Sequence, residues 1–175
     1  MGRRLRRHRW ALERAPNPRV LRLHVDVELT DRTIVTCPPD EPPALLAGLA
    51  SVPGVRSLDL HRYRARLNLS PDAVADSVAE AAAPVLAAAL GGDAERMRAD
   101  AGPRAFESEA EGSRLVAESA EMAERAGDAR LSAVFRVVGV VEAIAAPGLV
   151  LVRLGRLFAW DEGTTASVAE ALAGR

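Results

Sequence analysis

Three side chains that can bind a soft metal ion occur in the first half of the chain: His24, Cys37 and His61. Imidazole and thiolate are ligands that zinc and iron accept. However, no short ligand spacing links the three, and Cys37 is the single cysteine of the chain. One cysteine excludes an intramolecular disulfide and an all-cysteine metal site within one chain. We therefore expect no metal site and no cofactor, with Cys37 as the one candidate ligand.

Arginines form the second group of residues that could act chemically. The members that alternate with apolar residues in expected strands, or lie in the turn between them, are Arg22, Arg62, Arg64 and Arg66. Arginine forks pair well with carboxylates, so one interpretation is a docking surface for an acidic partner. The simpler interpretation is a solvated sheet face whose arginines pair with Asp26, Glu28 and Asp59. Both interpretations predict that the arginines share one sheet face or its rim.

Catalytic signatures are missing from the sequence. It contains no glycine-rich phosphate loop, no serine-centred elbow and no His-Glu metal helix. The carboxylates are spread along polar faces instead of clustering as acid–base catalysis requires. The two aromatic residues Phe135 and Trp160 are interpreted as core anchors. We expect a protein without enzymatic activity.

The net charge is −1 and every basic residue is arginine, so the molecule as a whole lacks a field that attracts polyanions. The first 15 residues are locally basic through Arg3, Arg4, Arg6, Arg7 and Arg9, with Trp10 as their only aromatic. Single-strand binders combine charge with several aromatic platforms, so nucleic-acid binding by this arm is an alternative that we do not favour. No apolar run approaches the ~20 residues of a membrane span, and the start lacks the apolar core of a secretion signal. The expected location is the cytoplasm, without a membrane partner.

These residues must be positioned by a duplicated scaffold. Residues 45–69 and 131–154 repeat one order of elements: an amphipathic segment, a glycine hinge, a strand, a turn and a strand. Gly54 and Gly139 are 85 positions apart (139 − 54). The same offset aligns Leu21 with Phe106 and Leu49 with Val134, which indicates internal duplication. The expected organisation is a basic arm (1–15), a first domain (16–92), a linker (93–102) and a second, divergent domain (103–175).

The first domain reads as β-β-α-β-β-α. Leu21 to Leu29 alternates apolar and polar residues, as expected for a strand with one wet face. Further strands are expected at 33–36, 55–60 and 63–69, and a helix at 45–52. Ser70 is expected to cap a final helix with Pro71 at its first position, and Gly91 ends it. The fold class is thus α+β, with helices on one face of an antiparallel sheet.

The second domain repeats this order with a weaker start. Strands are expected at 104–110, 113–118, 140–145 and 149–154. Ser119 begins one helical stretch, Asp128 caps a second, and 165–172 forms a short last helix. The strand LVLVRL is apolar on both faces apart from Arg153, so both faces should be covered. We expect this sheet to pack on the first domain or on another copy of the chain, as a homodimer.

Several short motifs in this order resemble the N-terminal domain of Nfu/NifU-like iron–sulfur scaffold proteins. In the first domain they are Pro16-Asn17-Pro18, Leu29-Thr30-Asp31-Arg32 and Val52-Pro53-Gly54-Val55; in the second they are Ser119-Ala120-Glu121, residues 135–140 (FRVVGV) and Trp160-Asp161. The resemblance covers residues 16–175 as two tandem copies. It implies a fold of this class and contact with client or assembly proteins.

The chain departs from that family where the chemistry is done. In the family, a separate C-terminal domain carries the cluster through a Cys-x-x-Cys pair, which has no counterpart here. Bridging a cluster between two subunits in that way takes at least two thiolates per chain. The resemblance therefore implies an accessory interaction module that assists cluster assembly or client docking. The alternative is metal or cluster handling by Cys37 shared between chains, with iron content lost in Cys37→Ser as its test.

Overall fold

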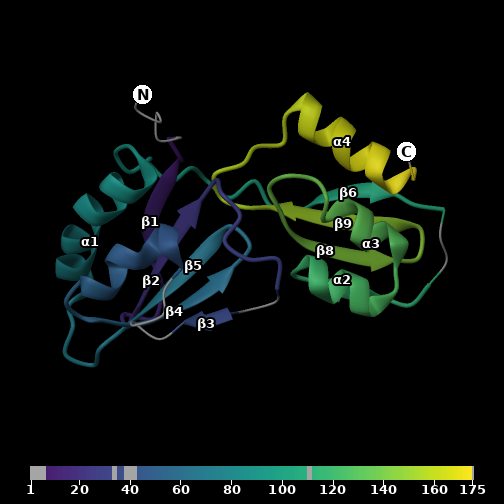
Figure 1. Cartoon of the computed structure of the whole chain (residues 1–175). Coiled ribbons are helices and arrows are strands. Elements are labelled where there is room, and N and C mark those ends of the chain that lie inside the picture. The colour runs from purple at the N-terminus through teal and green to yellow at the C-terminus, as the bar shows by residue number, and fades with distance from the viewer. Residues whose placement is uncertain (1–6, 33–34, 38–42, 110–111, 175) are drawn as a thin grey trace. The chain divides into compact units, whose positions relative to one another are not determined.

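The computed structural model in Figure 1 describes residues 7–32, 35–37, 43–109 and 112–174. Contacts divide the chain into two units, one of Met1–Thr30 and Ile34–Arg98 and the other of Asp31–Thr33 and Ala99–Arg175. The division after Arg98 falls inside the expected linker. Both units combine helices with antiparallel sheet, so the α+β class is confirmed. Within the described residues, no helix is long and apolar enough to cross a membrane.

The first unit is built on an antiparallel sheet with strand order β1-β2-β5-β4-β3. Its strands are β1 (Trp10–Arg14), β2 (Val20–Val25), β3 (Val35–Cys37), β4 (Val55–His61) and β5 (Arg64–Leu69). Alternation along β2, β4 and β5 places Leu23, Leu58 and Leu67 on one face, each at most 1% exposed. We call the opposite face the outer face of the first sheet.

Two helices cover the inner face of this sheet. The first is the 3₁₀ helix η1 (Ala44–Ser51), which buries Leu46 and Leu49; the second is α1 (Ala75–Leu90), which buries Val78, Ala82, Leu86 and Leu90. These side chains form one cluster with those of the inner face. The helices are therefore on one face, as the sequence predicts, although the expected α-helix at 45–52 is a 3₁₀ helix.

Strand β1 lies inside the stretch that we expected to be a basic arm. Trp10 is 1% exposed, and its indole Nε1 donates to the Gly92 carbonyl oxygen at 2.8 Å. All of β1 pairs antiparallel with β2, from Trp10 opposite Val25 to Arg14 opposite Leu21. The expectation that residues 1–15 precede the first domain is thus wrong for residues 10–14, because Trp10 and Leu12 supply apolar side chains to the inner face.

The start of α1 also differs from expectation. The helix begins at Ala75, with Val74 at the cap position, and not directly after Ser70. Ser70 instead closes a turn in which its carbonyl oxygen accepts from the Ala73 amide at 3.0 Å. The end is as predicted: Gly91 has φ +88° and caps the helix in the left-handed conformation that glycine adopts most readily.

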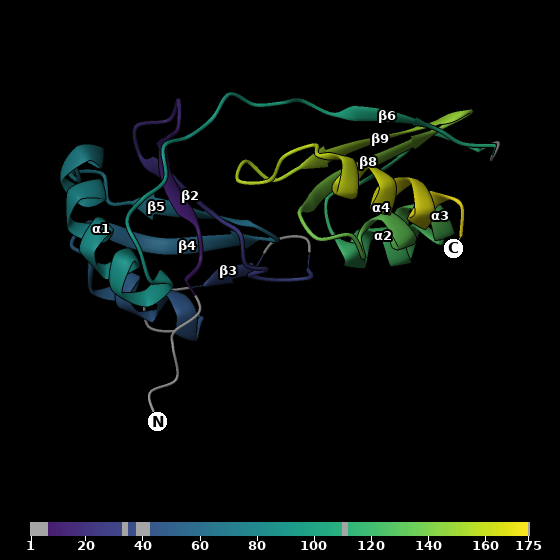
Figure 2. The same cartoon turned by 90° about the horizontal axis from the view of Figure 1, so that it is seen from above.

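The second unit repeats the plan with a sheet of order β6-β9-β8-β7. Its strands are β6 (Arg104–Glu107), β7 (Leu115–Ala117), β8 (Val140–Ala146) and β9 (Leu149–Leu154). The helices α2 (Ala120–Ala126), α3 (Ala129–Val134) and α4 (Glu162–Leu172) lie on one side of this sheet (Figure 2). Ser119 and Asp128 cap α2 and α3 through their side chains, as predicted.

The central hairpins match residue for residue at the offset of 85. Strands β4 and β5 run over 55–61 and 64–69, and β8 and β9 run over 140–146 and 149–154. Each hairpin has a register shift at the same place, between Val55 and Ser57 and between Val140 and Glu142. The amide that follows each hairpin bonds the hinge glycine: Ser70 N to Gly54 O at 2.9 Å and Gly155 N to Gly139 O at 2.8 Å.

The outer strands have shifted relative to these hairpins. Leu21 lies opposite Leu67, whereas Arg104, not Phe106, lies opposite Val152, the counterpart of Leu67. The structural offset of β6 from β2 is therefore 83 (104 − 21), which corrects the alignment of Leu21 with Phe106. A shift of two residues preserves which side chains face the helices, because side chains alternate with period two.

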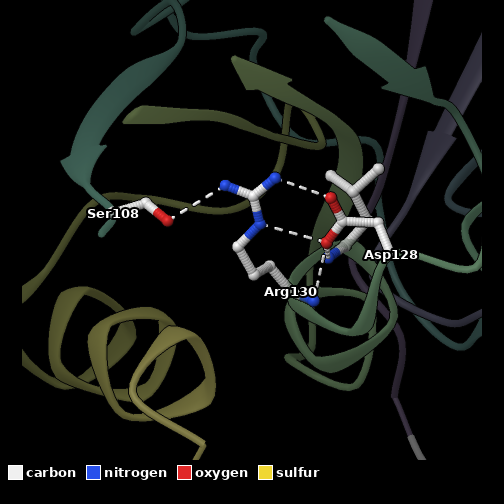
Figure 3. Close-up of polar contacts among 4 residues, drawn as sticks. Ser108, Asp128 and Arg130 are labelled. Carbon is white, nitrogen blue, oxygen red and sulfur yellow. Dashed lines mark hydrogen bonds and ion pairs between the residues drawn. The ribbon is translucent and has the colours of Figure 1, made fainter. Parts of the chain in front are cut away.

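Asp128 fixes the start of α3. Its carboxylate accepts from the backbone amide of Arg130 at 2.9 Å and from the Arg130 guanidinium at 2.7 and 3.1 Å (Figure 3). The other side of the guanidinium donates to Ser108 Oγ at 3.1 Å, just after β6. This mostly buried ion pair ties the helix start to the end of the edge strand.

Candidate functional site

The outer face of the first sheet brings together three of the four arginines singled out in the sequence. Strands β2 and β5 are neighbours, and their register places Arg22 opposite Arg66 and His24 opposite Arg64. Residues directly opposite each other in antiparallel strands share a face. Arg22, Arg64 and Arg66 therefore project from the face that carries no helix in the first unit, as the docking interpretation requires.

These three arginines line a cavity of about 320 Å³. We call it the arginine pocket; its lining is Ala15, Pro16, Asn17, Val20, Arg22, Arg64 and Arg66. The non-arginine part is the turn between β1 and β2, where the Asn17 carbonyl accepts from the Val20 amide at 3.1 Å. Pro16 and Pro18 favour extended backbone at residues 16–18. A turn forms instead because β1 precedes it and pairs with β2.

Arg62 has a different role from the other three. It lies in the turn between β4 and β5, it is 6% exposed, and it does not line the arginine pocket. Its guanidinium donates to Glu28 Oε2 at 3.2 Å and lies 5.2 Å from the centre of the Tyr63 ring. A buried guanidinium of this kind is held by its carboxylate and ring, so Arg62 supports the turn and is not placed to bind a partner.

Two of the acids expected to pair with the arginines, Asp26 and Asp59, form ion pairs or hydrogen bonds with other groups. Asp26 forms ion pairs with His8 and Arg9, both at 3.3 Å. Asp59 accepts from Asn68 Nδ2 at 2.9 Å and from Thr36 Oγ1 at 3.0 Å. Closer to the pocket, Glu13 on β1 lies 3.8 Å from Arg22 and 2.8 Å from His24. The expected pair of Glu28 with Arg62 therefore forms, although Arg62 is buried and not solvated. Glu13 is an acid that the sequence analysis did not include.

The pKa of His61, at the end of β4, depends on the positive charge of this face. Burial lowers the pKa of its imidazole first, and the charges of Arg64 and Arg66 lower it further, from 6.5 to about 4, against an opposing effect of Asp59. A nearby cation disfavours a second positive charge. His61 is therefore neutral near pH 7, and bound anions at the arginines would raise its pKa.

The sheet separates Cys37 from the two histidines among the soft-ligand candidates. Cys37 is the last residue of β3; it lies opposite the buried Leu58 and belongs to the core at 8% exposed. His24 and His61 lie on the outer face, opposite Arg64 on either side. Among the described residues, no group of three or more His, Cys, Asp and Glu is arranged to hold a metal ion. A buried thiol is also poorly placed to be shared between chains.

The basic start offers little to a nucleic acid where it is described. Arg3, Arg4 and Arg6 lie outside the described residues. Trp10, the one aromatic residue considered for base stacking, is buried in the sheet. His8 and Arg9 are engaged with Asp26, so the described part of the arm has become part of the first unit.

The second unit contains a larger groove of about 820 Å³ beside α3 and α4, which the sequence did not predict. In the first unit, Gly48 of η1 lies so close to α1 that a Cβ there would be 2.5 Å from Val85. Ala133, the residue 85 positions after Gly48, lines the groove instead. The groove mixes Arg136 with Asp161 and Glu170, and this mixed charge favours no ligand class.

The two expected core anchors differ in burial. Phe135 is 2% exposed and lies in the second core. Trp160 is partly buried; its ring lies 5.7 Å from Phe106, and the guanidinium of Arg104 lies 5.8 Å from its centre.

Comparisons of the chain with protein-family models, curated proteins and solved structures found no match.

Proposed function

We propose that this chain is a non-catalytic interaction module whose arginine pocket receives an acidic side chain of a partner protein. The observation that carries the proposal is the convergence of Arg22, Arg64 and Arg66 on one cavity. Guanidinium forks bind carboxylates in charge-assisted, two-point hydrogen bonds. The lowered pKa of His61 is due first to burial and then to the positive charges of Arg64 and Arg66, and this second contribution supports the proposal because an acidic ligand would offset it.

The biological setting is a second step of the proposal. The motifs that resemble the Nfu/NifU N-terminal domain favour a cytoplasmic role beside iron–sulfur cluster assembly, as an accessory protein that docks a client or an assembly factor. The chain would contribute binding and no cluster, since its one thiol lies in the core of the first unit. This step rests on the short motifs, and the binding experiment below does not depend on it.

A titration with a defined acidic probe tests the pocket. A hexapeptide of alternating Asp and Glu is added to the full chain while the NMR signals of the His61 ring are followed across pH. We expect saturable binding and a pKa for His61 that rises from about 4 toward its ordinary value. Arg66→Gln should weaken binding about tenfold or more, because a hydrogen bond to a charged group contributes about 1.5–3 kcal/mol.

Two controls make this result specific. The same hexapeptide with Asn and Gln in place of the acids should not bind, and Arg96→Gln, an exposed arginine after α1, should leave binding unchanged. Equal affinity for Arg22→Gln, Arg66→Gln and the unmodified chain would exclude the pocket as the binding site. If the pocket binds but Arg64→Glu with Arg66→Glu leaves every co-purifying partner in place, the cellular docking role is wrong.

A further inference from the structure

The face of the second sheet opposite its helices carries an uninterrupted apolar row. The register aligns Val116 with Ile144, Ile144 with Leu151, and Leu151 with Ala105, so the row crosses the sheet from β7 to β6. Val116 is 42% exposed, Ala105 is exposed, and Ile144 and Leu151 are half-buried. The helices α2, α3 and α4 lie on the other side (Figure 2), and none of the four residues belongs to the core cluster described for this unit.

The same row in the first sheet is polar at every position. Asp59 and Arg66 occupy the places of Ile144 and Leu151, 85 residues earlier, and lie directly opposite each other on neighbouring strands in the same way. Thr36 pairs with Asp59 as Val116 pairs with Ile144. Arg22 pairs with Arg66 as Ala105 pairs with Leu151. All four side chains of this row are therefore charged or hydroxylated in the first sheet and aliphatic in the second.

We propose that this row, Val116–Ile144–Leu151–Ala105, is the contact surface of a homodimer and packs against the same row of a second copy. In a two-fold interface, residues near the axis meet their own counterparts, so a charged row would place like charges together. An aliphatic row meets itself without that cost. Sheets commonly pack face to face through such side chains.

The charges beside the row favour a second copy over a charged partner. Glu142 and Arg153 lie at one edge and pair with each other at 3.3 Å, and Arg153 also pairs with Asp100 at 3.2 Å. These rim charges therefore need no counter-charge from an occupant. A partner that brought charges onto the row itself would bury them without a counter-ion, which is strongly unfavourable. A second copy of the chain would present the same uncharged, aliphatic row and would bury no unpaired charge.

The size of the row sets the expected strength. A row of four residues on strands about 4.8 Å apart is only about 15 Å long. The contact is therefore smaller than the roughly 800 Å² per partner of a standard stable interface. The dimer should therefore be weak and concentration-dependent. This proposal is independent of the arginine pocket, and either can fail without the other.

Sedimentation equilibrium of the full chain from about 10 μM to about 1 mM, the range suited to so small an interface, tests the proposal. We expect a monomer–dimer equilibrium. The double variant Ile144→Asp with Leu151→Arg, which introduces the residue pair of the first sheet, should weaken association at least tenfold. Ala105→Arg provides a second variant: its side chain is exposed on an edge strand, so the fold should be unaffected while a charge without a counter-ion enters the apolar contact.

A matched control is Val138→Asp, an exposed valine (66%) that lines the groove near α4 and lies outside the row. It should leave the dimer unchanged. A chain that stays monomeric at the highest concentration would overturn the proposal. So would a dimer that persists in both Ala105→Arg and the double variant, or one that only Val138→Asp disrupts.

Discussion

His61 shows how a single side chain can depend on neighbours that it does not hydrogen-bond. The imidazole is partly buried, and two arginines of β5 make a further positive charge unfavourable. Protonating it therefore opposes folding, whereas the unfolded chain accepts the proton near pH 6.5. Because the unfolded state binds the proton more tightly, the stability of the first unit should fall as pH drops from about 6.5 toward about 4.

The first prediction concerns that pH dependence. His61→Gln removes the titrating group, so the variant should lose less stability than the natural chain between pH 7 and pH 4.5. Urea denaturation at the two pH values, followed by the fluorescence of the tryptophans, measures the difference. Equal losses in both proteins would show that the pKa of His61 is not lowered in the folded state.

The second prediction concerns Asp128, whose pKa is lowered chiefly by the hydrogen bond from Arg130. Asp128→Asn keeps a good helix cap but removes the negative charge beside a mostly buried guanidinium, and should cost about 1–3 kcal/mol. Asp128→Ala also removes the cap and should cost about 1 kcal/mol more. Denaturant titrations at pH 7 give both values.

The same residue has an acid signature with a definite sign. A carboxylate with a lowered pKa contributes stability at pH values above its unfolded pKa of 3.8, and this contribution is lost as pH falls through the folded pKa. Asp128→Asn should therefore resemble the natural chain more closely at pH 3 than at pH 7. An equal difference at both values would contradict the ion pair.

At the scale of elements, the third prediction concerns the hinge glycines that precede β4 and β8. Gly139 has φ +92°, and a Cβ there would lie 2.7 Å from the Phe158 ring; Gly54 has φ +90° and would meet Ala73 and Val78 at 2.9 Å. Gly139→Ala and Gly54→Ala should each cost about 1–2 kcal/mol or more, from the left-handed backbone and the contact. Thermal unfolding measures this loss.

Gly92→Ala is the matched control for the hinge glycines. Gly92 lies outside the left-handed region, and a Cβ there would meet nothing within 4 Å. This substitution should be neutral or slightly stabilising, because alanine reduces the entropy of the unfolded chain. A cost at Gly92 equal to that at Gly139 would mean that the hinge conformation is not what matters.

Elements with strong local signals could be predicted from the sequence. The two hairpins, the glycine hinges and the caps at Ser119 and Asp128 follow from alternation, turn residues and side chains that bond backbone amides. These signals are short-range, so they survive in both copies. The three arginines of the pocket were also predictable, because alternation alone assigns them to the outer face.

The remaining features depend on long-range pairing that no local pattern encodes. Strand β1 is hidden in a basic stretch, and only its pairing with β2 makes Trp10 a core residue. The shift of β6 by two residues leaves the alternation unchanged, so the sequence could not reveal it. The turn between β1 and β2, which lines the arginine pocket, was not predicted for the same reason, because it depends on the pairing of these two strands.

At the scale of the whole molecule, each unit has its own apolar core. The fourth prediction is that limited trypsin digestion cuts first, within residues 15–174, at Arg96 or Arg98. Both are exposed in a stretch without helix or strand, and such segments are preferred sites of cleavage. Mass spectrometry should find two resistant fragments that meet there. Early cuts inside β5 or α3 would argue against two separately stable units.

The burial of Cys37 has a practical consequence. Its counterpart in the second sheet is Ala117, so the only thiol reports on one unit alone. A maleimide reagent should modify it only when the first core opens, and the labelling rate in native buffer would then measure that opening directly. No engineered cysteine is needed, so the unaltered chain allows this measurement. The labelling rate of Cys37 would report the opening of the first unit separately from that of the second.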